Sequence, residues 1–272
     1  MPLDVVRRLL APLLHPVATS QYPGAAPLLQ PATHGLPELD ANRCNGDAAC
    51  VAVCPTGAIE LSESNWSIDA GKCIFCNACA LACPNDAIRI GSRVELAGHA
   101  RDDLIEHRSL GAATTTSGIA ATSDPAAHLR TLIAGRVGRS LHVRHLDAGS
   151  CNGCDWEIAA LLNSYYDIQR LGIDFVASPR HADLLLVTGV MTSNLAEAAR
   201  RTYDAMPEPR LVVAVGACAI SGGVFAGSPV TGNGVGGTLP VDVFVPGCPP
   251  RPEAIIEGLL MAVGRRDAKA GA

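Results

Sequence analysis

The sequence predicts two domains of different fold class: a cysteine-rich α+β domain, followed by an α/β domain with a parallel sheet. Three observations predict this division. A cysteine pattern repeats within residues 44–84, a stretch of small and polar residues spans 111–127, and short apolar runs alternate with helical stretches from residue 140 onward. With 272 residues, the chain is long enough for two domains that each bury a core.

The composition argues against several classes of protein. The net charge of −5 and the pI near 5.9 are not those of a basic surface, so we expect no nucleic-acid partner. Eleven cysteines are many, but secreted disulfide scaffolds are usually short chains with an even number of thiols. The chain lacks an apolar run of the roughly 18 residues that span a bilayer, so we expect it to be soluble or peripheral.

Residues 1–37 are predicted to form an N-terminal amphipathic segment. Arg7 and Arg8 precede a short apolar stretch as in an export signal, but Pro12 and Pro16 interrupt that stretch. The segment is expected to cover the core of its own domain or to dock on a membrane or a membrane subunit. Its apolar residues lie at roughly helical spacing: Leu3, Val6, Leu10, Leu13 and Leu14.

Within residues 38–110, one ligand pattern occurs twice, 29 residues apart. A proline follows each copy, so the pattern is C-x2-C-x2-C-x3-C-P, with Asp47 at the second cysteine of the first copy. Three thiolates at this spacing wrap one cubane iron–sulfur cluster, and the fourth cysteine ligates the other cluster. A pair of zinc sites is the alternative, although zinc sites seldom use such a run. The two copies are Cys44, Asp47, Cys50 and Cys54, and Cys73, Cys76, Cys79 and Cys83.

This region resembles a two-cluster bacterial ferredoxin. A carboxylate is a harder donor than a thiolate and binds iron less tightly. The site of Asp47 is therefore expected to hold either an Asp-ligated 4Fe-4S cluster or a 3Fe-4S cluster, and we favour the first because aspartate remains an anionic ligand. A site that has lost its cluster and is kept for its shape is the other alternative. The resemblance implies two ligand sets: Cys73, Cys76, Cys79 and Cys54, and Cys44, Asp47, Cys50 and Cys83.

Two segments connect the predicted domains. Residues 94–110 predict a short helical tail. Residues 111–139 are predicted to be a linker, because their first part, "GAATTTSGIAATSDPAA", has small and polar residues and a single charge and cannot bury a core. A flexible linker of this kind lets two metal-binding domains settle side by side.

From residue 140 onward, apolar runs such as "LHVRHLDAG", "ADLLLVTGV" and "RLVVAVGA" alternate with helical stretches at 156–166 and 194–206. This alternation predicts a parallel sheet that is covered on both faces, with ligands at the carboxyl ends of its strands. A flavin pocket is the alternative for a flavodoxin-like sheet, but phosphate-binding loops do not carry four thiols. The four remaining cysteines follow predicted strands and indicate a third cluster site: Cys151, Cys154, Cys218 and Cys248.

The motifs "DAGSCNGCDWEI", "SPRHADLLLVTG", "GACAISGGVF" and "PVDVFVPGCPPRPE" resemble the small subunit of energy-converting, formate-hydrogenlyase-type (group 4) nickel–iron hydrogenases. That family is related to the complex I subunit that carries the last cluster before quinone. Complex I subunits have adjacent cysteines where Cys151 and Cys154 are separated by two residues, which favours the hydrogenase branch. The front half, with "KCIFCNACALACP", resembles the ferredoxin-type subunit of the same complexes. The implied fold is a ferredoxin-like α+β domain followed by a flavodoxin-like α/β domain at 140–272.

The resemblance implies an electron-transfer subunit, non-catalytic by itself, that passes electrons from the ferredoxin-type clusters through a proximal 4Fe-4S cluster to the nickel–iron site of a separate large subunit. The other implied partners are membrane proton- or ion-translocating subunits and an electron-donor subunit or soluble ferredoxin, at the inner face of the cell membrane. A nickel-free or quinone-reducing relative of complex I is the alternative. Arg180, His181 and Glu157 are candidates to act on the third cluster, Arg180 and His181 by tuning its potential and Glu157 by passing protons. Arg180 pairing with Asp183, and Glu157 as an ordinary acid at a helix start, are the alternatives.

Overall fold

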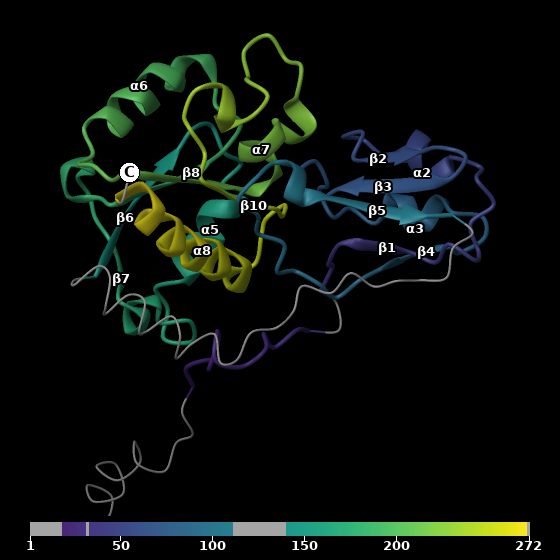
Figure 1. Ribbon diagram of the computed structural model, residues 1–272, viewed down its shortest axis with the longest axis horizontal. Helices are drawn as coiled ribbons and strands as arrows, with labels where there is room; N and C mark the ends of the chain where they lie inside the picture. Colours follow the sequence, from purple (N-terminus) through teal and green to yellow (C-terminus); the bar gives the residue numbers. More distant parts are fainter. Residues whose placement is uncertain (1–17, 31–32, 111–139, 271–272) are drawn as a thin grey trace, which may run out of the picture.

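The computed structural model describes residues 18–30, 33–110 and 140–270. The predicted helical stripe at residues 3–14 and the predicted linker, 111–139, lie outside the described residues. Residues 33–110 form one half of the molecule, here called the ferredoxin half, and residues 140–270 form the other, the sheet half. The two halves lie side by side (Figure 1).

The ferredoxin half contains two short helices and two small antiparallel sheets. The repeat in the sequence is also a repeat in structure, because helix α2 and strand β2 recur 29 residues later as α3 and β4. Strand β1 pairs with β4 of the second repeat, and β3, which precedes the second repeat, pairs with β2 of the first. The repeats are therefore interleaved. The elements are β1 (Pro37–Leu39), α2 (Ala49–Val53), β2 (Ile59–Leu61), β3 (Asn65–Asp69), α3 (Ala78–Ala82) and β4 (Ile88–Ile90).

The helical tail predicted for residues 94–110 is wrong. This segment contains a single 3-10 turn, η1 (Asp102–Leu104), and then strand β5 (Ile105–Ser109), which pairs with β3 in antiparallel register. A helix this short is marginal on its own, whereas the edge of β3 offers a full row of hydrogen-bonding partners. The pairing with a distant strand therefore decides the conformation.

The sheet half is built on five parallel strands in the order β10-β9-β8-β6-β7. Numbered from the first strand of this half, the order is that of the flavodoxin-like doubly wound fold. Every residue of β8 and β9 is buried, as expected when helices cover both faces of a sheet. The strands are β6 (Leu141–Asp147), β7 (Ile173–Phe175), β8 (Leu184–Thr188), β9 (Leu211–Val215) and β10 (Val243–Val245).

Two layers of helices cover this sheet (Figure 1). Leu184 and Leu186 of β8 share a core with α5 and α8, while the alternate residues Leu185 and Val187 share a second core with α6 and α7. The helix predicted at 194–206 is confirmed as α6, and the one predicted at 156–166 begins and ends earlier. The helices are α5 (Gly153–Ala160), α6 (Ser193–Asp204), α7 (Gly216–Ser221) and α8 (Pro252–Ala270), with 3-10 turns η3 (Ile168–Leu171), η4 (Pro179–His181), η5 (Gly223–Phe225) and η6 (Val235–Gly237). Among the described residues, no helix is long and apolar enough to cross a membrane.

The second core continues across the boundary between the halves. It includes Trp66 and Ile68 of the ferredoxin half together with Ile220 of α7. Gly98 and Phe244 form an antiparallel bridge that joins the ferredoxin half to β10. Residues 18–30 also run along the sheet half, where the Ser20 N–H donates to the carbonyl of Tyr165 at 2.7 Å. The halves are thus packed as one body rather than joined only by the linker.

Candidate metal centres

Three loops that carry predicted ligands share one backbone conformation. In each loop, the residue after the first ligand is left-handed, and a helix that carries the next cysteine begins one residue later. The left-handed residues are Ala48 (φ 60°), Asn77 (φ 65°) and Asn152 (φ 66°). Asp47 therefore occupies, in an unchanged loop, the position that a cysteine has in the other two. The ligand pairs are Asp47 and Cys50, Cys76 and Cys79, and Cys151 and Cys154.

The interleaved repeats bring Cys54 to the second loop. Burial, together with the nearby thiols of Cys54 and Cys76, raises the pKa of Cys73 to about 12 and that of Cys79 to about 11. These four thiols therefore form one group, as the ferredoxin resemblance implies. Four thiolates this close repel each other, and a positively charged metal centre relieves that repulsion.

Backbone N–H groups donate to the sulfur atoms of this half. The N–H of Ala58 lies 3.2 Å from Cys54 Sγ, and that of Ala87, its equivalent in the second repeat, lies 3.3 Å from Cys83 Sγ. Burial by itself raises the pKa of Cys54, but N–H groups of the following turn outweigh it, so the pKa is lowered overall. Hydrogen bonds of this kind stabilise thiolates and tune the potentials of iron–sulfur clusters.

The site of Asp47 is more exposed. Burial raises the pKa of Cys50, and the nearby thiol of Cys44 raises it further, so these two residues lie together. Asp47 is exposed, and its Oδ1 accepts a hydrogen bond from the Ala49 N–H at 2.9 Å. A carboxylate can accept several partners, so this bond is compatible with metal ligation. The membership of Cys83 in this group stays a prediction, based on its equivalence with Cys54.

The third group forms at the carboxyl edge of the parallel sheet. Its cysteines follow β6, β9 and β10, as the sequence predicts. Burial raises the pKa of Cys154 far above its ordinary value, and the thiols of Cys218, Cys248 and Cys151 raise it further. Burial likewise raises the pKa of Cys218 to about 11. The fold therefore gathers four thiols from three loops.

Two glycines keep space around these sulfur atoms. A Cβ on Gly216 would lie 2.6 Å from Cys154 Sγ, and one on Gly223 would lie 3.1 Å from Cys218 Sγ. Both glycines have positive φ, at 88° and 55°, which side chains rarely adopt. The residues present fit a cluster cradled by thiols and glycines. Sequence reasoning missed the glycines, although Gly216 directly follows a buried strand.

A hydrogen-bond network braces the loop of Cys151 and Cys154. The Asp155 carboxylate accepts from Thr188 Oγ1 at 2.9 Å, from His145 Nε2 at 2.8 Å and from the Ser150 hydroxyl. The Ser150 hydroxyl in turn accepts from the Asn152 N–H at 3.0 Å, at the left-handed residue of the loop. Burial lowers the pKa of His145, and Asp155 partly offsets this effect. Sequence reasoning did not identify this brace, because its members come from separate elements.

The described part of the chain contains no group of three or more His, Cys, Asp or Glu side chains that could hold a single metal ion. In an iron–sulfur cluster, by contrast, each thiolate binds a different iron atom. All eleven cysteines are free thiols.

Arg180 and His181 lie elsewhere than the sequence analysis expects. Both belong to η4, which precedes β8, whereas the cysteines follow the carboxyl ends of the strands. In a parallel sheet these are opposite edges, so the structure does not bring the two residues to the thiols. Asp183, the alternative partner of Arg180, accepts from the His142 N–H at 2.9 Å.

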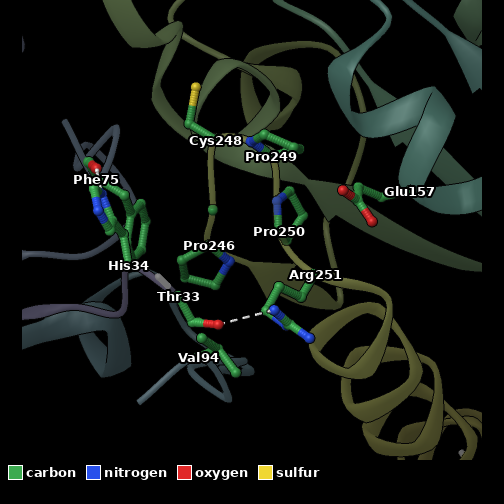
Figure 2. A pocket seen from close by; sticks show the side chains of 11 residues that line it. Thr33, His34, Phe75, Val94, Glu157, Pro246, Cys248, Pro249, Pro250 and Arg251 are labelled. Carbon is green, nitrogen blue, oxygen red and sulfur yellow. Dashed lines mark hydrogen bonds between the residues drawn. The ribbon is translucent and has the colours of Figure 1, made fainter. Parts of the chain in front are cut away.

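Glu157 lies in a cleft of about 280 Å³ between the two halves, together with Cys248 and Arg251 (Figure 2). Phe75 and His34 of the ferredoxin half face them across this cleft. Burial raises the pKa of Glu157, while the nearby Arg251 lowers it. Glu157 is thus a half-buried acid beside the third group, consistent with a proton-carrying side chain.

The comparisons with known proteins divide at the same place as the structure. Residues 37–60 and 66–89 match the family described as 4Fe-4S binding domain. Residues 151–262 match the family described as NADH ubiquinone oxidoreductase, 20 Kd subunit.

Several relatives match about two fifths to half of the chain. The probable membrane-bound hydrogenase subunit mbhJ of Pyrococcus furiosus is 52% identical over 127 residues, which are 47% of this chain and 76% of the relative. Formate hydrogenlyase subunit 7 of Escherichia coli is 41% identical over 143 residues, 53% of this chain and 56% of the relative. A subunit of the NADH-quinone oxidoreductase of Desulfovibrio desulfuricans is 50% identical over 107 residues, 39% of this chain and 58% of the relative. The chain belongs to the family of the NADH ubiquinone oxidoreductase 20 Kd subunit and the related small subunits of nickel–iron hydrogenases, and it carries 4Fe-4S binding domains in front of that subunit.

Proposed function

We propose that this chain is the electron-transfer subunit of a membrane-associated nickel–iron hydrogenase complex. It passes electrons from ferredoxin-type clusters through a proximal 4Fe-4S cluster to the nickel–iron site of a separate large subunit, where protons are reduced to hydrogen. The coarser part of this function, an electron-transfer subunit in a complex of the hydrogenase and complex I type, follows from the family.

Three ligand groups support the proposal. Cys54, Cys73, Cys76 and Cys79 would hold one 4Fe-4S cluster, and Cys151, Cys154, Cys218 and Cys248 would hold another. Cys44, Asp47, Cys50 and Cys83 would hold the third, as a 4Fe-4S or 3Fe-4S cluster. When bound, such clusters accept and donate single electrons. The chain contributes the ligands, the N–H groups that tune the sulfur atoms and the burial that excludes water.

The observation that carries the proposal is that the second and third groups meet at the cleft between the halves, which Phe75 and Cys248 both line. The thiol of Cys76 also contributes, after burial and Cys151, to the raised pKa of Cys248. Phe75, the neighbour of Cys76, lines the same cleft as Cys248 (Figure 2). This proximity supports electron transfer from the second group to the third.

The test compares two ligand variants in the assembled complex. Cys248→Ala is expected to remove the third cluster and stop hydrogen turnover, while an artificial donor still reduces the ferredoxin half. Cys73→Ala is expected to block the physiological donor, while a small donor that reduces the third cluster directly still supports some turnover. Normal hydrogen evolution by a Cys248→Ala complex that lacks the third cluster would overturn the proposal.

The large subunit decides between the hydrogenase and its nickel-free relatives. The match to a subunit of an NADH-quinone oxidoreductase favours a quinone-reducing complex as the second candidate. The two-residue spacing between Cys151 and Cys154 favours the hydrogenase. Metal analysis of the complex purified through this chain separates the two, because only the hydrogenase contains nickel in the large subunit. We expect that subunit to co-purify with membrane ion-translocating subunits from the inner face of the membrane, and with an electron-donor subunit or a soluble ferredoxin.

A further inference from the structure

A short set of contacts connects the loop of the second ligand group to the strand that leads to the third group. It begins at Asp69, which is 8% exposed. The carbonyl of Asp69 accepts the Cys73 N–H at 3.0 Å, and its Oδ1 accepts the Gly71 N–H at 2.9 Å. Asp69 therefore shapes the loop that enters the second group.

Arg101 holds this aspartate from the other side. Its two terminal nitrogens donate to the two carboxylate oxygens of Asp69 at 2.7 and 2.6 Å. A two-point pair of this kind fixes orientation as well as distance. The position of Arg101 thus determines the position of the Cys73 loop.

The segment before Arg101 is attached to the sheet half. Gly98 and Phe244 exchange two backbone hydrogen bonds, at 3.0 and 2.8 Å. The Ala97 N–H donates to Glu257 of α8 at 3.3 Å. Phe244 lies in β10, which leads directly to Cys248. A rigid connection therefore runs from the Cys73 loop through Arg101 to the strand that positions Cys248.

Gly71 lies close to the sheet half at this boundary. A Cβ on Gly71 would lie 2.8 Å from Ile220 Cγ2, on the helix that carries Cys218, and 2.8 Å from Arg101 Nη1. Gly71 does not have a positive φ, so a side chain here is opposed by its neighbours and not by backbone strain. A larger residue would separate the halves or displace Arg101.

We propose that Arg101 and Gly71 are positioning residues that fix the gap between the second and third ligand groups, so that an electron crosses between them without movement of the two halves. In this step the reduced second cluster loses one electron and the oxidised third cluster gains it, and no bond or proton changes place. The inference rests on the proposed electron-transfer function.

The test uses the full chain with its clusters restored, in the variants Gly71→Val, Gly71→Ala, Arg101→Ala and Arg101→Lys. Two readouts depend on the distance between the second and third clusters. They are the magnetic splitting between the two clusters when both are reduced, and the rate of electron transfer from the second cluster to the third after a rapid reduction pulse. A third, hydrogen exchange at the amides of Gly98 and Phe244, needs no metal. We expect Gly71→Val and Arg101→Ala to keep their iron, lose splitting, slow the transfer and exchange faster at both amides. Gly71→Ala and Arg101→Lys are expected to lie between these variants and the wild type.

Arg89→Ala is the matched control, because Arg89 pairs with Glu38 in the same half at 3.0 Å but is 80% exposed. Gly236→Ala controls for the glycine, since no atom lies within 4 Å of its added Cβ. Both controls should match the wild type in all three readouts.

Wild-type splitting and transfer in iron-replete Gly71→Val and Arg101→Ala would overturn the proposal. Loss of the second cluster in both Arg101 variants and both Gly71 variants would assign these residues to folding and would also overturn it. Because the splitting depends on distance and not on turnover, it tests positioning even if the complex makes no hydrogen.

Discussion

The two halves of this molecule build their metal sites in different ways. In the ferredoxin half, three ligands of each site lie within seven residues, on a loop with two left-handed residues, the second of which directly precedes a short helix. In the sheet half, the ligands follow three strands and are separated by up to 97 residues, from Cys151 to Cys248. The first kind of site depends on local backbone geometry, and the second depends on a correctly assembled sheet. The third site is therefore the one that changes in the surrounding fold should damage most.

The largest expected effect comes from Gly216→Ala. The added Cβ would lie only 2.6 Å from Cys154 Sγ, and the alanine would have to adopt a φ of 88°. Such a backbone conformation costs about 1–3 kcal/mol for a residue other than glycine. We expect loss of the third cluster and retention of both ferredoxin-half clusters, measured by iron content and by the paramagnetic spectrum of each cluster.

Gly236→Ala is again the control and should keep all clusters. If Gly216→Ala also keeps three clusters with unchanged spectra, the third site does not depend on the surrounding fold more than the other two sites do.

Asp47→Cys tests whether the loops of the ferredoxin half are equivalent. Asp47 and Cys76 are each flanked on both sides by residues of positive φ, so a cysteine at position 47 should fit without disturbing the fold. We expect an all-thiolate 4Fe-4S site with altered spectrum and potential, and an iron content of about twelve per chain. In the unchanged protein, about twelve irons indicate that Asp47 ligates a 4Fe-4S cluster, and about eleven indicate a 3Fe-4S cluster. Identical spectra and potentials before and after the substitution would show that Asp47 does not touch the cluster.

His145→Phe tests the brace on the third loop. It removes one donor to the Asp155 carboxylate, and a hydrogen bond to a charged group contributes about 1.5–3 kcal/mol. We expect a partial loss of the third cluster on heating or chelation and no change in the ferredoxin half. The His145→Gln variant can still donate to the carboxylate and should keep more of the third cluster than the Phe variant does. A Phe variant that keeps its third cluster as well as the wild type would show that His145 does not stabilise this loop.

Glu257→Gln is expected to affect the metal sites least. The pKa of Glu257 is raised from 4.5 to about 7, mainly by burial and in part by nearby Glu95, while the hydrogen bond from the Ala97 N–H opposes the shift. The folded chain therefore keeps a proton between pH 4.5 and 7 that the unfolded chain releases, so stability falls as pH rises through this window.

At about 1.4 kcal/mol for each pKa unit, the fall contributed by Glu257 is at most about 3.5 kcal/mol. The amide of glutamine does not titrate. The unfolding free energy of the Glu257→Gln variant should therefore decline less between pH 4.5 and 7. Denaturant titrations at several pH values measure the difference, with cluster spectra as the check that the sites are unchanged. Parallel pH profiles of the two proteins would contradict the assignment to Glu257.

The sequence predicts features that depend on the spacing within one loop or on a general rule for parallel sheets. The repeat of 29 residues, the crossing of Cys54 to the second loop and the thiols at the ends of β6, β9 and β10 are all visible in spacing and hydrophobic pattern. Each depends on backbone geometry within one loop or on the rule that parallel strands end at the same edge.

The tertiary structure decided the features that join distant residues. The strand at 105–109 exists because β3 offers it an edge, and Arg180 and His181 lie away from the thiols because the loops before and after a strand are on opposite edges. The close approach of Gly71 to Ile220 exists only when the two halves pack, and the pair between Arg101 and Asp69 joins residues 32 positions apart within the ferredoxin half. The energies of such contacts depend on three-dimensional proximity, and a linear sequence carries no periodic signal for them.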